Sequence, residues 1–102
     1  MEETGGLDTI TEVIAAELDQ EVGRAFANVQ HTLEHAGSKG WEQVYRVRIY
    51  LVALDNESLE LVVRNLRKYC PNHQPILTAV GVAKLALEGM RIEIEVAAHV
   101  GA

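Results

Sequence analysis

The sequence predicts an α/β or α+β fold, a sheet layered with helices, and three observations support this class. Apolar residues recur at spacings of three and four in two separate segments, which is typical of helices. Segments dense in β-branched residues follow both of these, which is typical of strands. The length of 102 residues, 48% of them hydrophobic and 24% charged, fits one soluble globular domain.

The first predicted helix starts near Leu18, and Gly37 offers a stop at its C-terminal end. The residues of its apolar face are Leu18, Val22, Phe26, Val29 and Leu33. Residues 44–54 then predict a strand with one polar face. In its first half Arg46, Arg48 and Tyr50 alternate with Val47, Ile49 and Leu51.

Asp55 or Asn56 is expected to cap a second helix, and Pro71 to end it. Its predicted apolar stripe consists of Leu59, Val62, Val63, Leu66 and Tyr69. Two further strands are predicted over 76–85 and 90–100, with a turn at Glu88 and Gly89 between them. A short strand over 9–14 is also expected before the first helix.

Two helices can cover only one face of such a sheet. The other face, which carries Arg48, Tyr50 and Glu93, must meet solvent or another subunit. Self-association is therefore the leading physical expectation for this chain.

Charge and cysteine content exclude several classes of function. The formal charge of −6 and the scattered nine Lys and Arg residues argue against a nucleic-acid partner. We see no apolar stretch long enough to span a bilayer, so no membrane partner is expected. Cys70 is the single cysteine and cannot form an internal disulfide, which favours a reducing compartment. We see no targeting signal at the N-terminus and expect a cytoplasmic protein.

Several blocks of the chain resemble the YjgF/RidA family in order and spacing. The strongest block is the C-terminal run, in which Pro75, a strand ending in Val82 to Leu85 and a final Ile-Glu-Ile-Glu strand follow one another. The other matching blocks are residues 25–29, 33–37 and 44–51. The resemblance implies a chorismate-mutase-like fold with a mixed sheet, two helices on one face and assembly as a homotrimer.

Many members of this family hydrolyse reactive enamines and imines at pockets between subunits, without a metal or a cofactor. The family's deaminases hold the substrate carboxylate with an arginine two residues after the proline, and that position is Leu77 here. Their helix asparagine corresponds to Val63, whereas their glutamate on the last strand is retained as Glu93. The resemblance also implies that the single domain, residues 1–102, lacks the family's first β-hairpin.

These matches give a candidate site near the last strands of the sheet. Glu93 is the candidate catalytic residue, and its alternative role is a cross-strand ion pair with Arg46, Arg48 or Arg91. The candidate substrate-binding residues are Arg48, Tyr50, Leu77 and Thr78. Arg48 is either a substitute anchor for the substrate or the partner of Glu93 or Glu95.

Histidine and cysteine patterns give no metal site. His31 and His35 stand four residues apart, a spacing that can chelate a metal, but no third ligand is evident. Cys70 and His73 have no second Cys/His pair. We therefore expect neither a metal nor a cofactor.

Three functions remain open from the sequence. The leading hypothesis is a divergent YjgF/RidA-type homotrimer that binds a small, apolar or weakly anionic metabolite in subunit-interface pockets, because a leucine cannot hold a carboxylate. The second is a 2-iminobutanoate or 2-iminopropanoate deaminase-like hydrolase in which Glu93 positions water and Arg48 binds the substrate. The third is a protein-interaction or chaperone-like module whose sheet edge captures a partner strand.

Overall fold

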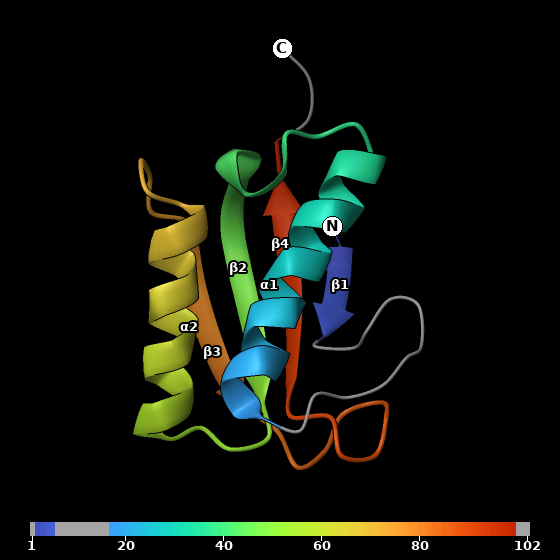
Figure 1. The fold of residues 1–102 in the computed structure, drawn as a ribbon, viewed down its shortest axis with the longest axis vertical. Helices are drawn as coiled ribbons and strands as arrows, with labels where there is room; N and C mark the ends of the chain where they lie inside the picture. The colour runs from blue at the N-terminus through green and yellow to red at the C-terminus, as the bar shows by residue number, and fades with distance from the viewer. Residues whose placement is uncertain (1, 6–16, 100–102) are drawn as a thin grey trace.

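The computed structural model describes residues 2–5 and 17–99 (Figure 1). Its elements are β1 (Glu2–Gly5), α1 (Leu18–His35), the 3₁₀ helix η1 (Gly40–Gln43), β2 (Val44–Leu51), α2 (Asn56–Tyr69), β3 (Ile76–Gly81) and β4 (Ile92–Ala98). The strands form one mixed sheet in the order β1-β4-β2-β3, in which β2 and β3 are parallel and the other pairs antiparallel. Both helices lie on one face of this sheet (Figure 1), which confirms the predicted fold class.

The apolar face predicted for α1 forms the centre of the core. The buried apolar residues of α1 are Val22, Ala25, Phe26, Val29 and Leu33. The helix ends where Gly37 adopts a positive φ of 91°. The N–H of Ser38 then donates to the carbonyl of Leu33 over 2.9 Å, which satisfies a carbonyl that has no partner within the helix. The predicted stop at Gly37 is confirmed.

Trp41 of η1 belongs to the same core as the apolar face of α1. Its indole N–H donates to the carbonyl of Phe26 over 2.8 Å, and its ring stacks on the Phe26 ring with centroids 4.9 Å apart. Tyr69, at the end of α2, lies 6.0 Å from the Trp41 ring. Aromatic pairs at such distances add to the stabilisation from burial alone, so this cluster joins the middle of α1 to η1 and to the end of α2.

Asp55 caps α2, as predicted. Its Oδ1 accepts a hydrogen bond from the backbone N–H of Ser58 over 2.8 Å, and this bond is the main cause of the lowered pKa of Asp55. The helix ends at Tyr69, before Pro71. The predicted apolar stripe was wrong at Val63, which is 36% exposed, because the core-facing side chains of this region come from Leu61 and Val62.

The strand ends differ from the predicted ones because a strand lasts only while its ladder partner follows it. β2 ends at Leu51 and not at 54, β3 at Gly81 and not at 85, and β4 covers 92–98 and not 90–100. Two backbone hydrogen bonds lie just beyond these strand ends. The N–H of Val82 donates to the carbonyl of Leu51 over 2.8 Å, and the N–H of Val52 donates to the carbonyl of Arg91 over 3.0 Å. The predicted turn at Glu88 and Gly89 is confirmed, with Gly89 at a φ of 83°.

The sequence did not predict β1. Its residues Glu2 to Gly5 pair antiparallel with Val96 to Glu93 of β4. Four residues are too few to show a strand period, so the pattern gave no signal there. The strand predicted over 9–14 lies outside the described residues. The absence of an opening hairpin stays a prediction.

The two faces of the sheet have different chemistry. On the helix side, β2 and β4 contribute a continuous apolar layer that is almost fully buried. Its members are Val47, Ile49, Leu51, Ile92, Ile94 and Val96. We call the opposite side, which no described helix covers, the open face. Neither helix in the described part of the chain combines the length and apolarity that a membrane crossing requires.

Candidate functional site

Four of the predicted site residues lie on the open face. Arg48 and Tyr50 project from β2, and their neighbours in register are Thr78 of β3 beside Arg48 and Glu93 of β4 beside Tyr50. Residues directly opposite one another on paired strands point to the same side of the sheet. Arg48 and Thr78 are exposed, whereas Tyr50 and Glu93 are half-buried. The structure therefore brings these four residues together.

Arg48 pairs with Glu95 and not with Glu93. Its Nη1 lies 3.2 Å from Oε1 of Glu95. The pKa of Arg48 is raised, first by a hydrogen bond to the side chain of Tyr50 and then by attraction to Tyr50 and to Glu95. The ion-pair role of Arg48 is thus confirmed with one of its two predicted partners, and this exposed pair contributes little to stability.

Leu77 lies on the other side of the sheet from these four residues. Its partner in register is Val47, whose side chain is buried in the apolar layer beneath the helices. Leu77 and Thr78 are neighbours in sequence, but successive residues of a strand point to opposite faces. The sheet therefore separates Leu77 from Arg48 and Glu93, which the sequence had suggested as parts of one site.

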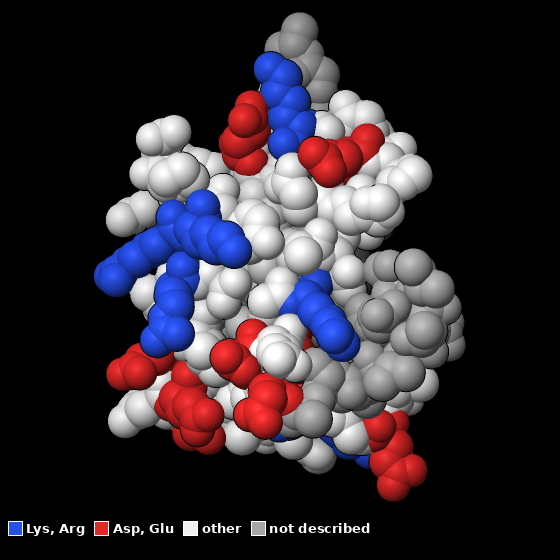
Figure 2. Space-filling view, viewed as in Figure 1, with Lys and Arg blue, Asp and Glu red and all other residues white. Residues whose placement is uncertain are grey.

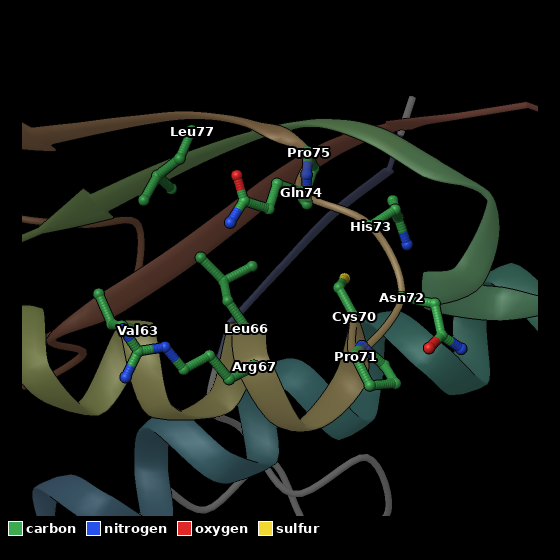
Figure 3. A pocket seen from close by; sticks show the side chains of 10 residues that line it. All are labelled: Val63, Leu66, Arg67, Cys70, Pro71, Asn72, His73, Gln74, Pro75 and Leu77. Carbon is green, nitrogen blue, oxygen red and sulfur yellow. The ribbon is translucent and has the colours of Figure 1, made fainter.

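Leu77 instead faces a hollow of about 680 Å³ between the C-terminal half of α2, the loop 70–75 and the start of β3 (Figure 3). The residues that line it are Val63, Leu66, Arg67, Cys70, Pro71, Asn72, His73, Gln74, Pro75 and Leu77. This volume suits a small organic ligand. The hollow therefore becomes the main candidate for a binding site in this subunit.

The inner wall of the hollow is apolar and its rim is polar. Figure 3 shows Leu66 of α2 and Leu77 of β3 facing the same space, with the side-chain amide of Gln74 pointing into it. Arg67 extends along α2 toward Val63, at the edge of this space. An apolar wall with a few polar groups is typical of pockets that bind small molecules.

Arg67 is the cation of this hollow. Among the residues that the structure describes, it takes part in no ion pair. It belongs to the basic last turn of α2, whereas Glu57 lies in the first turn. Figure 2 shows this separation on the helix side of the molecule, with Lys and Arg gathered over one half of α2 and Asp and Glu around its other end.

Cys70 and His73 line the hollow but are engaged in the fold. Cys70 is buried, and burial raises the pKa of its thiol, which stays protonated at neutral pH and is a poor nucleophile. Its Sγ lies 3.8 Å from the carbonyl oxygen of Trp41. Nε2 of His73 lies 2.8 Å from the carbonyl oxygen of Val44 and ties the loop 70–75 to β2.

The sequence reasoning missed Arg67 and Gln74. A signal for Arg67 was available, because it follows Val63 by four residues and such residues share a helix face. Gln74 gave no signal, since its position depends on the course of the loop before Pro75. Tertiary structure was needed to place it.

The two histidines that were considered as metal ligands, both on α1, contact each other. The rings of His31 and His35 meet edge to face with centroids 4.5 Å apart, and both residues are exposed. In the described ranges 2–5 and 17–99, no group of three or more His, Cys, Asp or Glu side chains is arranged to hold a metal ion.

Comparisons with known proteins agree with this architecture. RidA from the Antarctic bacterium Psychrobacter sp. is 22% identical with a TM-score of 0.82, over 94% of this chain and 75% of that one. A Rid-family protein of unknown function from Yersinia pestis is 24% identical with a TM-score of 0.83, over 94% and 73%. A YjgF-family member from Mycobacterium tuberculosis is 23% identical with a TM-score of 0.78, over 97% and 75%. At these identities the likeness shows the fold alone.

The sequence itself carries the family signal. No curated protein matches the chain. The sequence profile of the endoribonuclease L-PSP family, however, matches residues 4–100. The chain therefore belongs to the endoribonuclease L-PSP family, which is the YjgF/RidA family that its sequence resembles.

Proposed function

We propose that this chain is a divergent YjgF/RidA-type homotrimer that binds a small metabolite in pockets between subunits. One observation carries the proposal. Val63 and Leu77, which stand where the family's deaminases carry asparagine and arginine, line the same hollow although they come from α2 and β3. The hollow is thus the counterpart of the family's ligand site, with two of its polar groups replaced by apolar ones.

The positions of Leu77 and Glu93 support a pocket built by two copies of the chain. They lie on opposite faces of one sheet, so a single subunit cannot present both to one ligand. A second copy that sets its open face against the hollow of the first would bring them together. Each pocket of the trimer would then combine the Leu77 side of one subunit with the Glu93 side of its neighbour.

The open face has the chemistry of a surface that packs against another copy. Ile76 and Val80 of β3 share this face with Arg48 and are 66% and 37% exposed. Glu93 and Glu95 of β4 offer the opposite charge to arginines on the same face. Exposed apolar side chains beside charges of both signs favour association with another protein surface.

The apolar lining argues against the usual deaminase activity. Leu77 cannot replace an arginine that makes two charge-assisted hydrogen bonds to a carboxylate, each worth about 1.5–3 kcal/mol. Val63 cannot replace a hydrogen-bonding asparagine. A 2-imino acid placed with its carboxylate at position 77 would lose several orders of magnitude in affinity without these groups, so we expect no turnover of this substrate.

The alternative is an imine or enamine hydrolase in which Glu93 positions water and Arg48 binds the substrate. It is favoured by the closeness of Arg48 and Glu93 on the open face. However, Arg48 already pairs with Glu95, and it lies across the sheet from Leu77. A substrate bound by Arg48 would therefore have to compete with Glu95 for the guanidinium.

Ammonia release separates the two functions. The full chain is mixed with a freshly generated source of 2-aminoacrylate or 2-iminobutanoate beside Leu77→Arg and Glu93→Gln variants. We expect wild-type ammonia release at the spontaneous rate, unchanged in Glu93→Gln. Turnover by the wild type that Glu93→Gln abolishes would overturn the binding proposal in favour of the hydrolase.

A further inference from the structure

We propose that Arg67 selects an anionic ligand for the hollow, and that this ligand is a monocarboxylate with an apolar body. The inference rests on the proposed function, in which the hollow binds a small molecule. It adds the ligand's charge, the residue that recognises it and the orientation of the ligand between α2 and β3.

Arg67 is the lining residue best suited to bind an anion. It extends along the edge of the hollow (Figure 3), and within the described residues it has no carboxylate partner. A planar guanidinium can donate two parallel hydrogen bonds to one carboxylate. The Gln74 amide points into the same space from the side of β3 and can donate a hydrogen bond to another polar group of the ligand.

The neighbouring cations of α2 do not serve the hollow. Arg64 lines two other surface depressions, one of which it shares with Arg67, but it does not line this hollow. Nζ of Lys68 lies over the ring of Tyr69, 5.4 Å from its centroid, and Lys68 is not among the lining residues. Among the described residues that line the hollow, Arg67 is the one Lys or Arg, and Glu93 of a neighbouring copy would add a negative charge, so a monoanion suits the site better than a phosphate dianion.

The apolar wall fixes the ligand's orientation. Leu66 and Leu77 lie deeper between α2 and β3 than Arg67, which stands on the helix at the rim. A carboxylate bound by Arg67 therefore leaves the rest of the ligand to pack against the two leucines. Contact with this wall favours an aliphatic chain, because burial of each CH₂ group contributes about 0.8 kcal/mol. The anchor has thus moved from the strand at position 77 to the helix at position 67.

The test compares a charged probe with its neutral analogue. Hexanoate and hexanamide are titrated into the ¹⁵N-labelled full chain, and dissociation constants are read from the amide shifts of residues that line the hollow. We expect hexanoate to bind at least about tenfold more tightly than hexanamide, as charge-assisted hydrogen bonds imply. Arg67→Met should abolish this difference by weakening hexanoate alone. Arg64→Met, a matched change one turn away, should leave both affinities unchanged.

The possible negative results separate the role of Arg67 from the proposed function of the hollow. Equal binding of the two probes to the wild type, or unchanged hexanoate affinity in Arg67→Met, would overturn the role of Arg67 while leaving the hollow as a ligand site. Absence of shifts at Leu66, Cys70 and Leu77 with both probes would overturn the proposed function and this inference together. Arg67 is exposed, and the same spectra report whether each variant keeps the fold.

Discussion

A buried carboxylate joins the first turn of α1 to the start of β4. The side chain of Glu21 is fully buried, and its Oε1 and Oε2 accept hydrogen bonds from Nε and the backbone N–H of Arg91 over 2.6 and 2.7 Å. A helix N-terminus also favours the negative charge. This single residue therefore holds the end of the loop before β4 against the helix.

Loss of this carboxylate should be costly. Glu21→Ala removes both acceptors and leaves a cavity, so we expect the free energy of unfolding to fall by about 2–4 kcal/mol. Urea unfolding of the full chain measures the change. Glu34→Ala, on the exposed side of the same helix, is the control and should change stability by less than about 0.5 kcal/mol. Similar losses in both variants would contradict the role of Glu21.

Substitution of glycine by alanine should have opposite effects on stability at Gly40 and at Gly23. Gly40 has a φ of 86°, and a Cβ there would collide with the side chain of Gln30, which accepts a hydrogen bond from the N–H of Trp41. Gly40→Ala should therefore destabilise by about 2–3 kcal/mol. Gly23 lies inside α1 with open space around its Cβ position, and Gly23→Ala should stabilise by about 0.5–1 kcal/mol. Thermal unfolding gives both signs, and a stable Gly40→Ala would refute the proposed packing.

At the scale of elements, the cap of α2 predicts how stability depends on pH. The folded state lowers the pKa of Asp55 below 3.8, chiefly through the hydrogen bond from Ser58. The cap's stabilisation is therefore fully present above the unfolded pKa and is lost as pH falls through the folded one. Asp55→Ala should lower the Tm at pH 7. Asp55→Asn should keep the cap and show a smaller loss of Tm on acidification than the wild type; an equal loss would show that Asp55 is not responsible.

Periodicity predicted the helices well and the strand ends poorly. The apolar face of α1 and its C-terminal end before Gly37 depend on residues close together in the sequence, so local rules predict them. The end of β3 at Gly81 does not, because it is set where β2 and β3 separate, and residues 82–85 have strand-like composition without a ladder partner. Val63 was misplaced for a similar reason, since only the packing of α2 shows which apolar residues reach the core.

At the scale of the whole molecule, the sequence indicated the family and the open face. It did not show that the candidate site residues are divided between the two faces of the sheet. The strand 76–81 reads Ile-Leu-Thr-Ala-Val-Gly, which has no polar alternation that would assign its faces. Leu77 and Thr78 must point to opposite faces of the sheet, but only the register with Val47 and Arg48 shows which of them shares a face with Arg48. Arg67 was missed because the family comparison directs attention to the positions of lost residues, and not to a new cation one turn away.

Leu77 and Glu93 lie on opposite faces of the sheet, and one subunit cannot build a pocket from both faces. The proposed pocket can therefore form only if subunits assemble. Sedimentation equilibrium of the full chain at micromolar concentration measures the assembly directly. The proposed shared pocket predicts a particle of three times the 11.2 kDa chain mass. A particle of 11.2 kDa that does not associate as concentration rises would contradict it, and would leave the hollow beside Leu77 without the second face that the proposed function requires.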